Sequence, residues 1–267
     1  MKLIRRFKSK VKHHKASAIL GLLICSISSS SAIAASDVES SYSTHQDDRV
    51  SQDCVILIHG LARNTGSMFF ISRFLKQKNY WVVRVAYPST DESIEYLAEQ
   101  YLPPAIKECQ KETKGQIHFV THSLGGILVR QFFQDKSFPR IRRVVMLSPP
   151  NKGSEVSDFL KDSILYRWLN GPAGQQLSTE STSLPNQLKP IDLEVGVITG
   201  NSSYEPWFSL LSEGEDDGKV SVENARLDEM VDFLVVPNNH TFIMNDSGVM
   251  KQVDQFLRNG HFEKDTE

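Results

Sequence analysis

The sequence predicts an α/β fold with a mostly parallel, doubly wound sheet of about six strands and a small helical cap. Six short runs of apolar and β-branched residues recur along the chain, as is typical of strands buried on both faces of a parallel sheet. Segments with helical periodicity separate most of these runs, which predicts repeated strand–helix–strand units. The composition is that of an ordinary globular protein, with 40% apolar and 23% charged residues.

The pattern places each element along the chain. Strands are expected at residues 54–58, 81–86, 117–120, 143–147, 193–198 and 232–236. Helices are expected at residues 68–78, 93–109, 124–135 and 249–258. The second helical segment contains Pro103 and Pro104, and because proline lacks the amide hydrogen that a helix interior uses, we expect a break or restart there.

The first 34 residues have the features of a secretory signal peptide. Seven basic and no acidic residues precede an apolar stretch at 16–27, and the segment ends in Ala32-Ile33-Ala34. We therefore expect cleavage after Ala34, export, and a periplasmic or secreted mature protein. The alternatives are an uncleaved anchor, although spanning needs about 20 apolar residues, a lipoprotein signal at Cys25, and twin-arginine export through Arg5-Arg6. Residues 35–53 are polar and are expected to form a flexible lead-in to one domain at 54–267.

Charge and motifs exclude several classes of function. Without residues 1–34, 23 basic residues face 32 acidic ones, a net charge of −9. Such an acidic chain is a poor candidate for nucleic-acid binding, which needs clustered Lys and Arg. The sequence has no Gly-rich phosphate loop, no His/Cys metal cluster and no cofactor motif, so we expect neither a cofactor nor a metal.

A candidate nucleophile follows the third expected strand. The run Thr121-His122-Ser123-Leu124-Gly125 matches the G-x-S-x-G nucleophile elbow, with Thr121 at the first small position. Such a sharp strand-to-helix turn presents the serine above the sheet, and its neighbours must be small. We expect His122 to point elsewhere and to be structural.

A candidate oxyanion loop follows the first expected strand as His59-Gly60-Leu61-Ala62. The backbone amides of Leu61 and of Leu124, the residue after the nucleophile, are the expected donors to an oxyanion. We interpret His59 as a structural histidine that supports the loop.

With these motifs the chain resembles the α/β-hydrolase superfamily, and in particular bacterial lipases and esterases with a His-Gly-Leu oxyanion loop. The resemblance covers the chain from Val55 to the final helix. It implies a triad in the chain order Ser, Asp, His, with the acid after the penultimate strand and the histidine after the last. His240 fills the histidine position, and it is the only histidine between His122 and His261.

The triad acid implied by the resemblance is Asp217. Lipases of this type carry an Asp-Gly-x-Val element, which Asp217-Gly218-Lys219-Val220 matches. The neighbouring Asp216 and a solvated acidic turn remain alternatives. Calcium-bearing lipases of this type place an Asp two residues after the histidine, where this chain has Phe242, so we expect no structural calcium.

The leading hypothesis is an exported serine carboxylester hydrolase that acts on small-molecule or lipid esters. In this hypothesis Ser123 attacks the acyl carbon, His240 is the base, and Asp217 fixes the tautomer of His240. An acyltransferase on the same fold and a non-catalytic secreted binding scaffold are the alternatives.

Residues 150–190 are expected to form a cap over one end of the sheet, with helical patches at 156–160 and 164–169. Apolar residues there and nearby could line an acyl pocket, could contact a membrane surface transiently, or could only pack the cap on the core. They are Phe69, Phe70, Phe159, Leu160, Ile164, Leu165, Tyr166, Trp168, Leu169, Trp207, Phe208, Leu210 and Leu211.

Cys54 and Cys109 are expected to form a disulfide. Export favours oxidation, and Cys25 leaves with the signal peptide, so two cysteines remain. Cys54 opens its strand at the end of the sheet away from the candidate site, and the helix containing Cys109 returns to that end. In α/β hydrolases the strands that begin at these points are neighbours, and two buried free thiols are the alternative.

Overall fold

The computed structural model describes residues 52–203 and 214–264, with the side chains of 165–168 left out. The predicted signal peptide at 1–34 and nearly all of the lead-in at 35–53 lie outside the described residues. So do Trp207, Phe208, Leu210, Leu211 and the side chains of Leu165, Tyr166 and Trp168.

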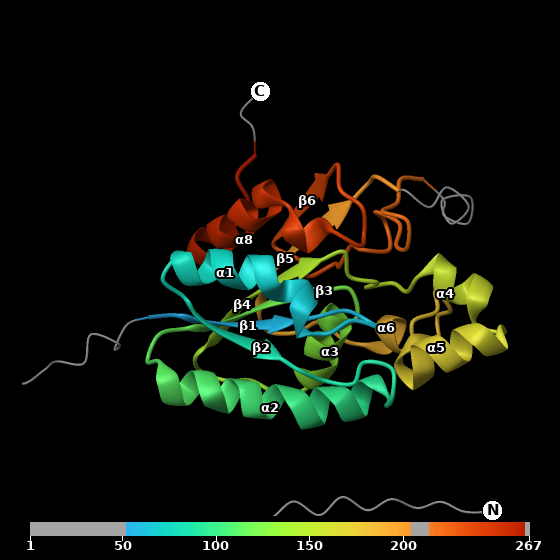
Figure 1. Ribbon diagram of the computed structural model, residues 1–267, viewed down its shortest axis with the longest axis horizontal. Helices are drawn as coiled ribbons and strands as arrows, with labels where there is room; N and C mark the ends of the chain where they lie inside the picture. The colour runs from blue at the N-terminus through green and yellow to red at the C-terminus, as the bar shows by residue number, and fades with distance from the viewer. Residues whose placement is uncertain (1–51, 204–213, 265–267) are drawn as a thin grey trace, which may run out of the picture. The chain divides into compact units, whose positions relative to one another are not determined.

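Six parallel strands form one sheet in the order β2-β1-β3-β4-β5-β6, which confirms the predicted fold class (Figure 1). Their bounds are β1 Cys54–Ile58, β2 Trp81–Val85, β3 Ile117–His122, β4 Ile141–Leu147, β5 Glu194–Gly200 and β6 Asp232–Val236. Because all strands run the same way, their carboxyl ends share one edge of the sheet, and the segments that follow β1, β3, β5 and β6 meet there.

Helices cover both faces of this sheet. Helices α1 (Phe69–Gln77) and α8 (Ser247–Asn259) lie on one face, and α2 (Ile94–Glu112) and α3 (Leu124–Phe132) lie on the other (Figure 1). Successive side chains of β1 alternate between two buried clusters, with Ile56 packed among residues of α2 and α3 and Val55 among residues of α1 and α8. Burial on both faces explains why the sequence of β1 is continuously apolar.

The predicted break in the second helix is wrong, because α2 continues through Pro103 and Pro104. Both prolines lie on the exposed face of the helix. A backbone carbonyl that loses its amide partner to proline can bond to water on such a face, so the helix persists. No helix among the described residues is long and apolar enough to cross a membrane.

The expected cap contains three helices, α4 (Glu155–Leu160), α5 (Ile164–Gln175) and α6 (Leu184–Gln187). Helix α5 is kinked at Gly171, whose φ of 59° lies in the left-handed region. A Cβ atom at Gly171 would lie 1.5 Å from the carbonyl oxygen of Thr90, so only glycine lets the cap approach the segment after β2 this closely.

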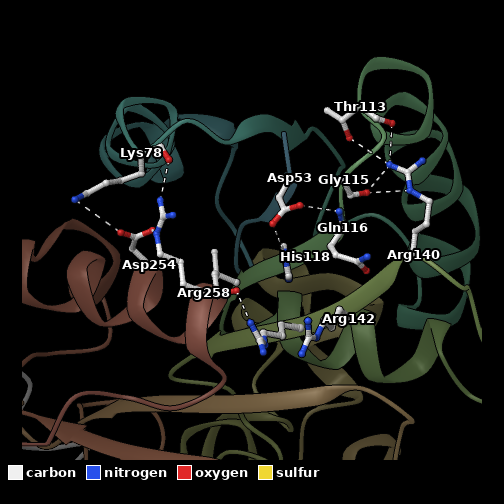
Figure 2. A network of polar contacts seen from close by, with 12 residues as sticks. Asp53, Lys78, Thr113, Gly115, Gln116, His118, Arg140, Arg142, Asp254 and Arg258 are labelled. Atoms are coloured by element: carbon white, nitrogen blue, oxygen red, sulfur yellow. Dashed lines mark hydrogen bonds and ion pairs between the residues drawn. The ribbon is translucent and has the colours of Figure 1, made fainter. Parts of the chain in front are cut away.

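Figure 2 shows a polar network at the amino end of the sheet. Asp53, directly before β1, accepts a 2.7 Å hydrogen bond from the backbone N–H of Gln116, and its other carboxylate oxygen lies 3.6 Å from Nε2 of His118 (Figure 2). The guanidinium of Arg140 donates to the carbonyl oxygen of Gly115 at 2.6 Å (Figure 2). These contacts fasten the starts of β1 and β4 to the loop that precedes β3, and they join Asp53 to the start of β3.

Cys54 and Cys109 form a disulfide at this end of the structure, between the start of β1 and the last turns of α2. Their Cα atoms lie 5.7 Å apart, and both residues are fully buried. Cys54 is aligned with Ile117, the first residue of β3, so β1 and β3 are neighbours as the resemblance implies.

Candidate active site

Ser123 lies at a sharp turn between β3 and α3. Its backbone has φ 51° and ψ −122°, a conformation that L-residues rarely adopt and that turns the chain from strand to helix. The turn is held because the N–H of Ser123 donates to the carbonyl of Leu147 at 2.9 Å, and the N–H of Gly126 donates to the carbonyl of Ser123 at 2.9 Å. A Cβ atom at Gly125 would lie 2.8 Å from the carbonyl oxygen of Ile58, which explains the glycine two residues after the serine.

His240 stands between Ser123 and Asp217. Its Nε2 lies 3.0 Å from Oγ of Ser123, and its Nδ1 lies 2.9 Å from Oδ2 of Asp217. The backbone N–H of His240 also donates to the carbonyl of Asp217 at 2.9 Å. All three residues are buried, and they come from loops that follow β3, β5 and β6. The structure therefore brings together three residues that are far apart in the sequence.

The carboxylate of Asp217 is held by donors on both oxygens. Its Oδ1 accepts the backbone N–H groups of Lys219 at 3.1 Å and Val220 at 2.9 Å, while Oδ2 faces His240. Burial acts to raise the pKa of Asp217, but the His240 ring and the backbone donors outweigh burial and hold this pKa below its ordinary value. Asp217 is therefore an ionised acceptor, which can orient the His240 ring.

Asp216, the alternative acid, has a different place. Its Oδ1 accepts the backbone N–H of Gly218 at 2.7 Å, within the turn itself. The approach of the His240 loop depends on Gly200, the last residue of β5, where a Cβ atom would lie 2.0 Å from the carbonyl oxygen of Asn238. Geometry favours Asp217 as the partner of the histidine, because its Oδ2 lies 2.9 Å from Nδ1 of His240.

The loop after β1 packs directly on the serine turn. A Cβ atom at Gly60 would lie 2.8 Å from Nδ1 of His122 and 3.1 Å from Cβ of Ser123, so glycine permits this approach. His59 stacks on Tyr87 with ring centroids 4.2 Å apart, and its Nδ1 lies 2.9 Å from the carbonyl oxygen of Gly60. Burial lowers the pKa of His59, so its ring is a neutral support for the loop.

The two expected oxyanion donors flank the serine in the structure. Leu61 lines the same cavity as Ser123, and Leu124 is the first residue of α3. The first N–H groups of a helix have no partner within the helix, so the N–H of Leu124 can donate a hydrogen bond to a negatively charged oxygen.

The expectation that His122 points away from the site is wrong. Its Nε2 lies 2.9 Å from the backbone carbonyl oxygen of His240, and the two histidine rings have centroids 4.9 Å apart. Because a carbonyl oxygen can only accept, Nε2 of His122 carries the hydrogen and donates it. Burial, and then the charges of His240 and Arg63, lower the pKa of His122 well below its ordinary value, so the ring is neutral.

A cavity of about 530 Å³ opens above Ser123 and His240. Its apolar lining residues include Leu61, Val156, Leu160, Leu169, Leu177 and Val220. Its polar lining residues include Arg63, Ser154, Ser157, Ser163, Asn170 and Lys219. A mixed lining of this kind suits a ligand that has both an apolar part and a polar group.

Sequence reasoning identified only part of this lining. Leu160 and Leu169 were expected there, whereas Phe69, Phe70, Phe159 and Ile164 are exposed. Leu177 was missed because it follows the predicted helical patch without a periodic pattern. Arg63 was missed too, although its position two residues after Leu61 was a usable signal.

Comparisons with known proteins point to one fold. The mature form of lipase BlEst2 from Bacillus licheniformis is similar with a TM-score of 0.64 and 18% identity, over 81% of this chain and 94% of that chain. The metagenomic carboxyl esterase MGS0156 is similar with a TM-score of 0.56 and 17% identity, over 71% of this chain and 65% of that chain. Phospholipase PlaB from Legionella pneumophila is similar with a TM-score of 0.52 and 19% identity. The match covers 66% of this chain and 46% of that chain, so this chain spans less than half of that protein.

No model of a known protein family and no curated protein sequence matches the chain. The likeness in structure therefore carries the assignment, together with the strand order and the turn that holds Ser123. The chain has the fold of the α/β-hydrolase superfamily.

Proposed function

We propose that the protein is a serine carboxylester hydrolase. The observation that carries this proposal is the unbroken chain of contacts from Ser123 Oγ to His240 Nε2 at 3.0 Å and from His240 Nδ1 to Asp217 Oδ2 at 2.9 Å, at the base of a cavity. Proteins named lipase, carboxyl esterase and phospholipase share the fold, which supports ester chemistry.

In the proposed reaction, Ser123 Oγ attacks the acyl carbon while His240 Nε2 takes the hydroxyl proton. The carbonyl oxygen gains negative charge, which the backbone N–H groups of Leu61 and Leu124 stabilise. His240 then gives its proton to the leaving alcohol, and an acyl-serine remains. Water attacks this ester with His240 again as the base, which releases the acid and restores Ser123.

Hydrolysis of p-nitrophenyl acetate and butyrate tests this proposal. Ser123→Ala is expected to lower kcat on the order of a millionfold, because the nucleophile is lost. Ser181→Ala, which removes a hydroxyl from an exposed residue, is the matched control and should match the wild type. Equal activity of Ser123→Ala and the wild type would overturn the proposal.

The apolar residues that line the cavity support an acyl chain as the bound group. Leu160 lines the cavity, whereas its neighbour Phe159 in α4 is 66% exposed. We expect Leu160→Ala to reduce kcat/KM for an octanoate ester more than for an acetate ester, by about 0.8 kcal/mol for each CH₂ that loses its contact. Phe159→Ala is the control, and equal losses for both chain lengths with Leu160→Ala would favour a packing role alone.

Export is the second part of the proposal. The basic and apolar pattern of residues 1–34 supports it, as does a disulfide in the folded domain, because disulfides persist in oxidising compartments. Expression of the full chain in a bacterium, fractionation and mass spectrometry would test it. We expect a periplasmic or secreted protein that begins at Ala35, and a cytoplasmic protein that keeps residues 1–34 would contradict export.

A further inference from the structure

Arg63 stands at a fixed position on the rim of the cavity. The preceding Ala62 has a left-handed φ of 53°, and the following Asn64 caps a short 3-10 helix, η2 (Thr65–Met68). The side-chain Oδ1 of Asn64 accepts a hydrogen bond from the N–H of Gly66 at 2.8 Å. The backbone carbonyl of Asn64 accepts one from the hydroxyl of Ser67, also at 2.8 Å. The Arg63 backbone is thus held from both sides, two residues after the expected oxyanion donor.

The charge of Arg63 has no counterion within the described residues. The side chain is half-buried and lines the cavity, and no ion pair or hydrogen bond of Arg63 occurs in the described part of the chain. Arg140 is also half-buried, but its guanidinium donates to backbone carbonyls at 2.6–2.9 Å. Cationic side chains that lose water normally gain a partner, so an unpaired arginine on a cavity wall is open to an external anion.

The surroundings of Arg63 favour an anion. Among the described residues that line the cavity, the ionisable side chains other than histidine are Arg63 and Lys219, and no carboxylate is present. The charge of Arg63 also lowers the pKa of His122, whose ring contacts the His240 loop, so the charge acts close to the serine.

We propose that Arg63 binds an anionic group of the substrate, a carboxylate or a phosphate, and selects esters that carry a negative charge near the scissile bond. The planar guanidinium fork matches both groups bidentately. This inference rests on the proposed esterase function and adds the class of substrate. The anion belongs either to the acyl chain or to the alcohol, and the experiment separates these two sources.

Two matched pairs of esters provide the test. For an anion on the acyl side, p-nitrophenyl hydrogen glutarate is compared with p-nitrophenyl methyl glutarate. For an anion on the alcohol side, 1-butyrylglycerol 3-phosphate is compared with 1-butyrylglycerol. The measured quantity is the ratio of kcat/KM for the charged ester to that for the neutral ester, so intrinsic reactivity cancels between variants.

Arg63→Gln is expected to lower this ratio roughly tenfold in at least one pair, and 1 M salt should reduce the difference because it screens the contact. Arg63→Lys should restore part of the ratio. Arg73→Gln removes the same charge from an exposed position on α1 and should keep the wild-type ratio. An unchanged ratio in both pairs for Arg63→Gln, in an active enzyme, overturns this inference alone. Failure of the folded wild type to hydrolyse any of the four esters overturns the proposed function and this inference with it.

Discussion

The Nε2–H of His122 donates a hydrogen bond of 2.9 Å to the backbone carbonyl oxygen of His240. This contact joins the turn that carries the serine to the loop that carries the histidine, 118 residues later. The opposite nitrogen of His122 faces Gly60, where a Cβ atom would lie 2.8 Å away. The His122 ring therefore lies where the elbow, the His240 loop and the loop after β1 meet.

If His122 positions the His240 loop, replacing it should affect turnover more than binding. His122→Leu removes the donor, and we expect kcat to fall about fivefold with a smaller change in KM, since one buried hydrogen bond is worth about 1 kcal/mol. His122→Gln keeps an N–H donor and should recover part of kcat. Steady-state kinetics on one ester checks this, and equal losses in the Leu and Gln variants would argue against a positioning role.

The two aspartates of the acid loop give a matched pair of variants. Asp217→Asn is expected to lower kcat by about 10³–10⁴-fold, because the amide cannot hold His240 in the same tautomer. Asp216→Asn should cost less than roughly tenfold, since its carboxylate accepts a backbone N–H of the turn. The kcat values of the two purified variants decide which aspartate is the triad acid. A lower kcat for Asp216→Asn than for Asp217→Asn would assign this role to Asp216.

The disulfide between Cys54 and Cys109 should contribute to stability. It closes a loop with a sequence separation of 55 residues. In the chain-entropy model, such a loop is worth about 4 kcal/mol. Urea unfolding of the mature protein with and without reductant should show this loss, and the protein unfolded without reductant should have no thiol that can be alkylated. Two alkylated thiols would show that the bridge does not form.

The lowered pKa of Asp232 predicts that this residue contributes to stability in a pH-dependent way. Burial acts to raise its pKa, but Lys264 and the backbone N–H groups of Phe262 and Phe233, each at 2.8 Å, hold the pKa below its ordinary value. A lowered pKa in the folded state stabilises the fold above the unfolded pKa of about 3.9, and this stabilisation is lost as the pH falls through the folded pKa.

We therefore expect Asp232→Asn to lower the free energy of unfolding by about 1–2 kcal/mol at pH 7 and by less at pH 3. Asp228→Asn removes a charge from an exposed position and serves as the control. Urea unfolding at both pH values provides the measurement. A difference between wild type and Asp232→Asn that does not change with pH would rule out this linkage.

The sequence was most informative where burial dominates. All six strands form within three residues of their expected bounds, because runs such as that of β1 are apolar on both faces. The nucleophile-elbow motif and the resemblance to α/β hydrolases also predicted Ser123, Asp217 and His240 as candidate site residues at one edge of the sheet. These features depend on local patterns that a single sequence records.

The rest depends on tertiary contacts. The helix through Pro103 and Pro104 continues because that face is exposed, which periodicity alone did not predict. The direction of the His122 ring and the cavity position of Arg63 follow from how three loops pack at the sheet edge. Helix α6 is only four residues long, too short to show a period.

Covalent labelling is the most direct way to test whether Ser123 is an activated nucleophile. The mature protein would be treated with an alkyl fluorophosphonate, digested, and analysed by mass spectrometry, with Ser123→Ala and His240→Ala in parallel. We expect one adduct on the peptide that contains Ser123 and none in Ser123→Ala. Labelling of His240→Ala should be much slower, because Nε2 of His240 lies 3.0 Å from the serine oxygen. Labelling of folded Ser123→Ala at the wild-type rate, or a folded wild type that stays unlabelled, would contradict this role of Ser123.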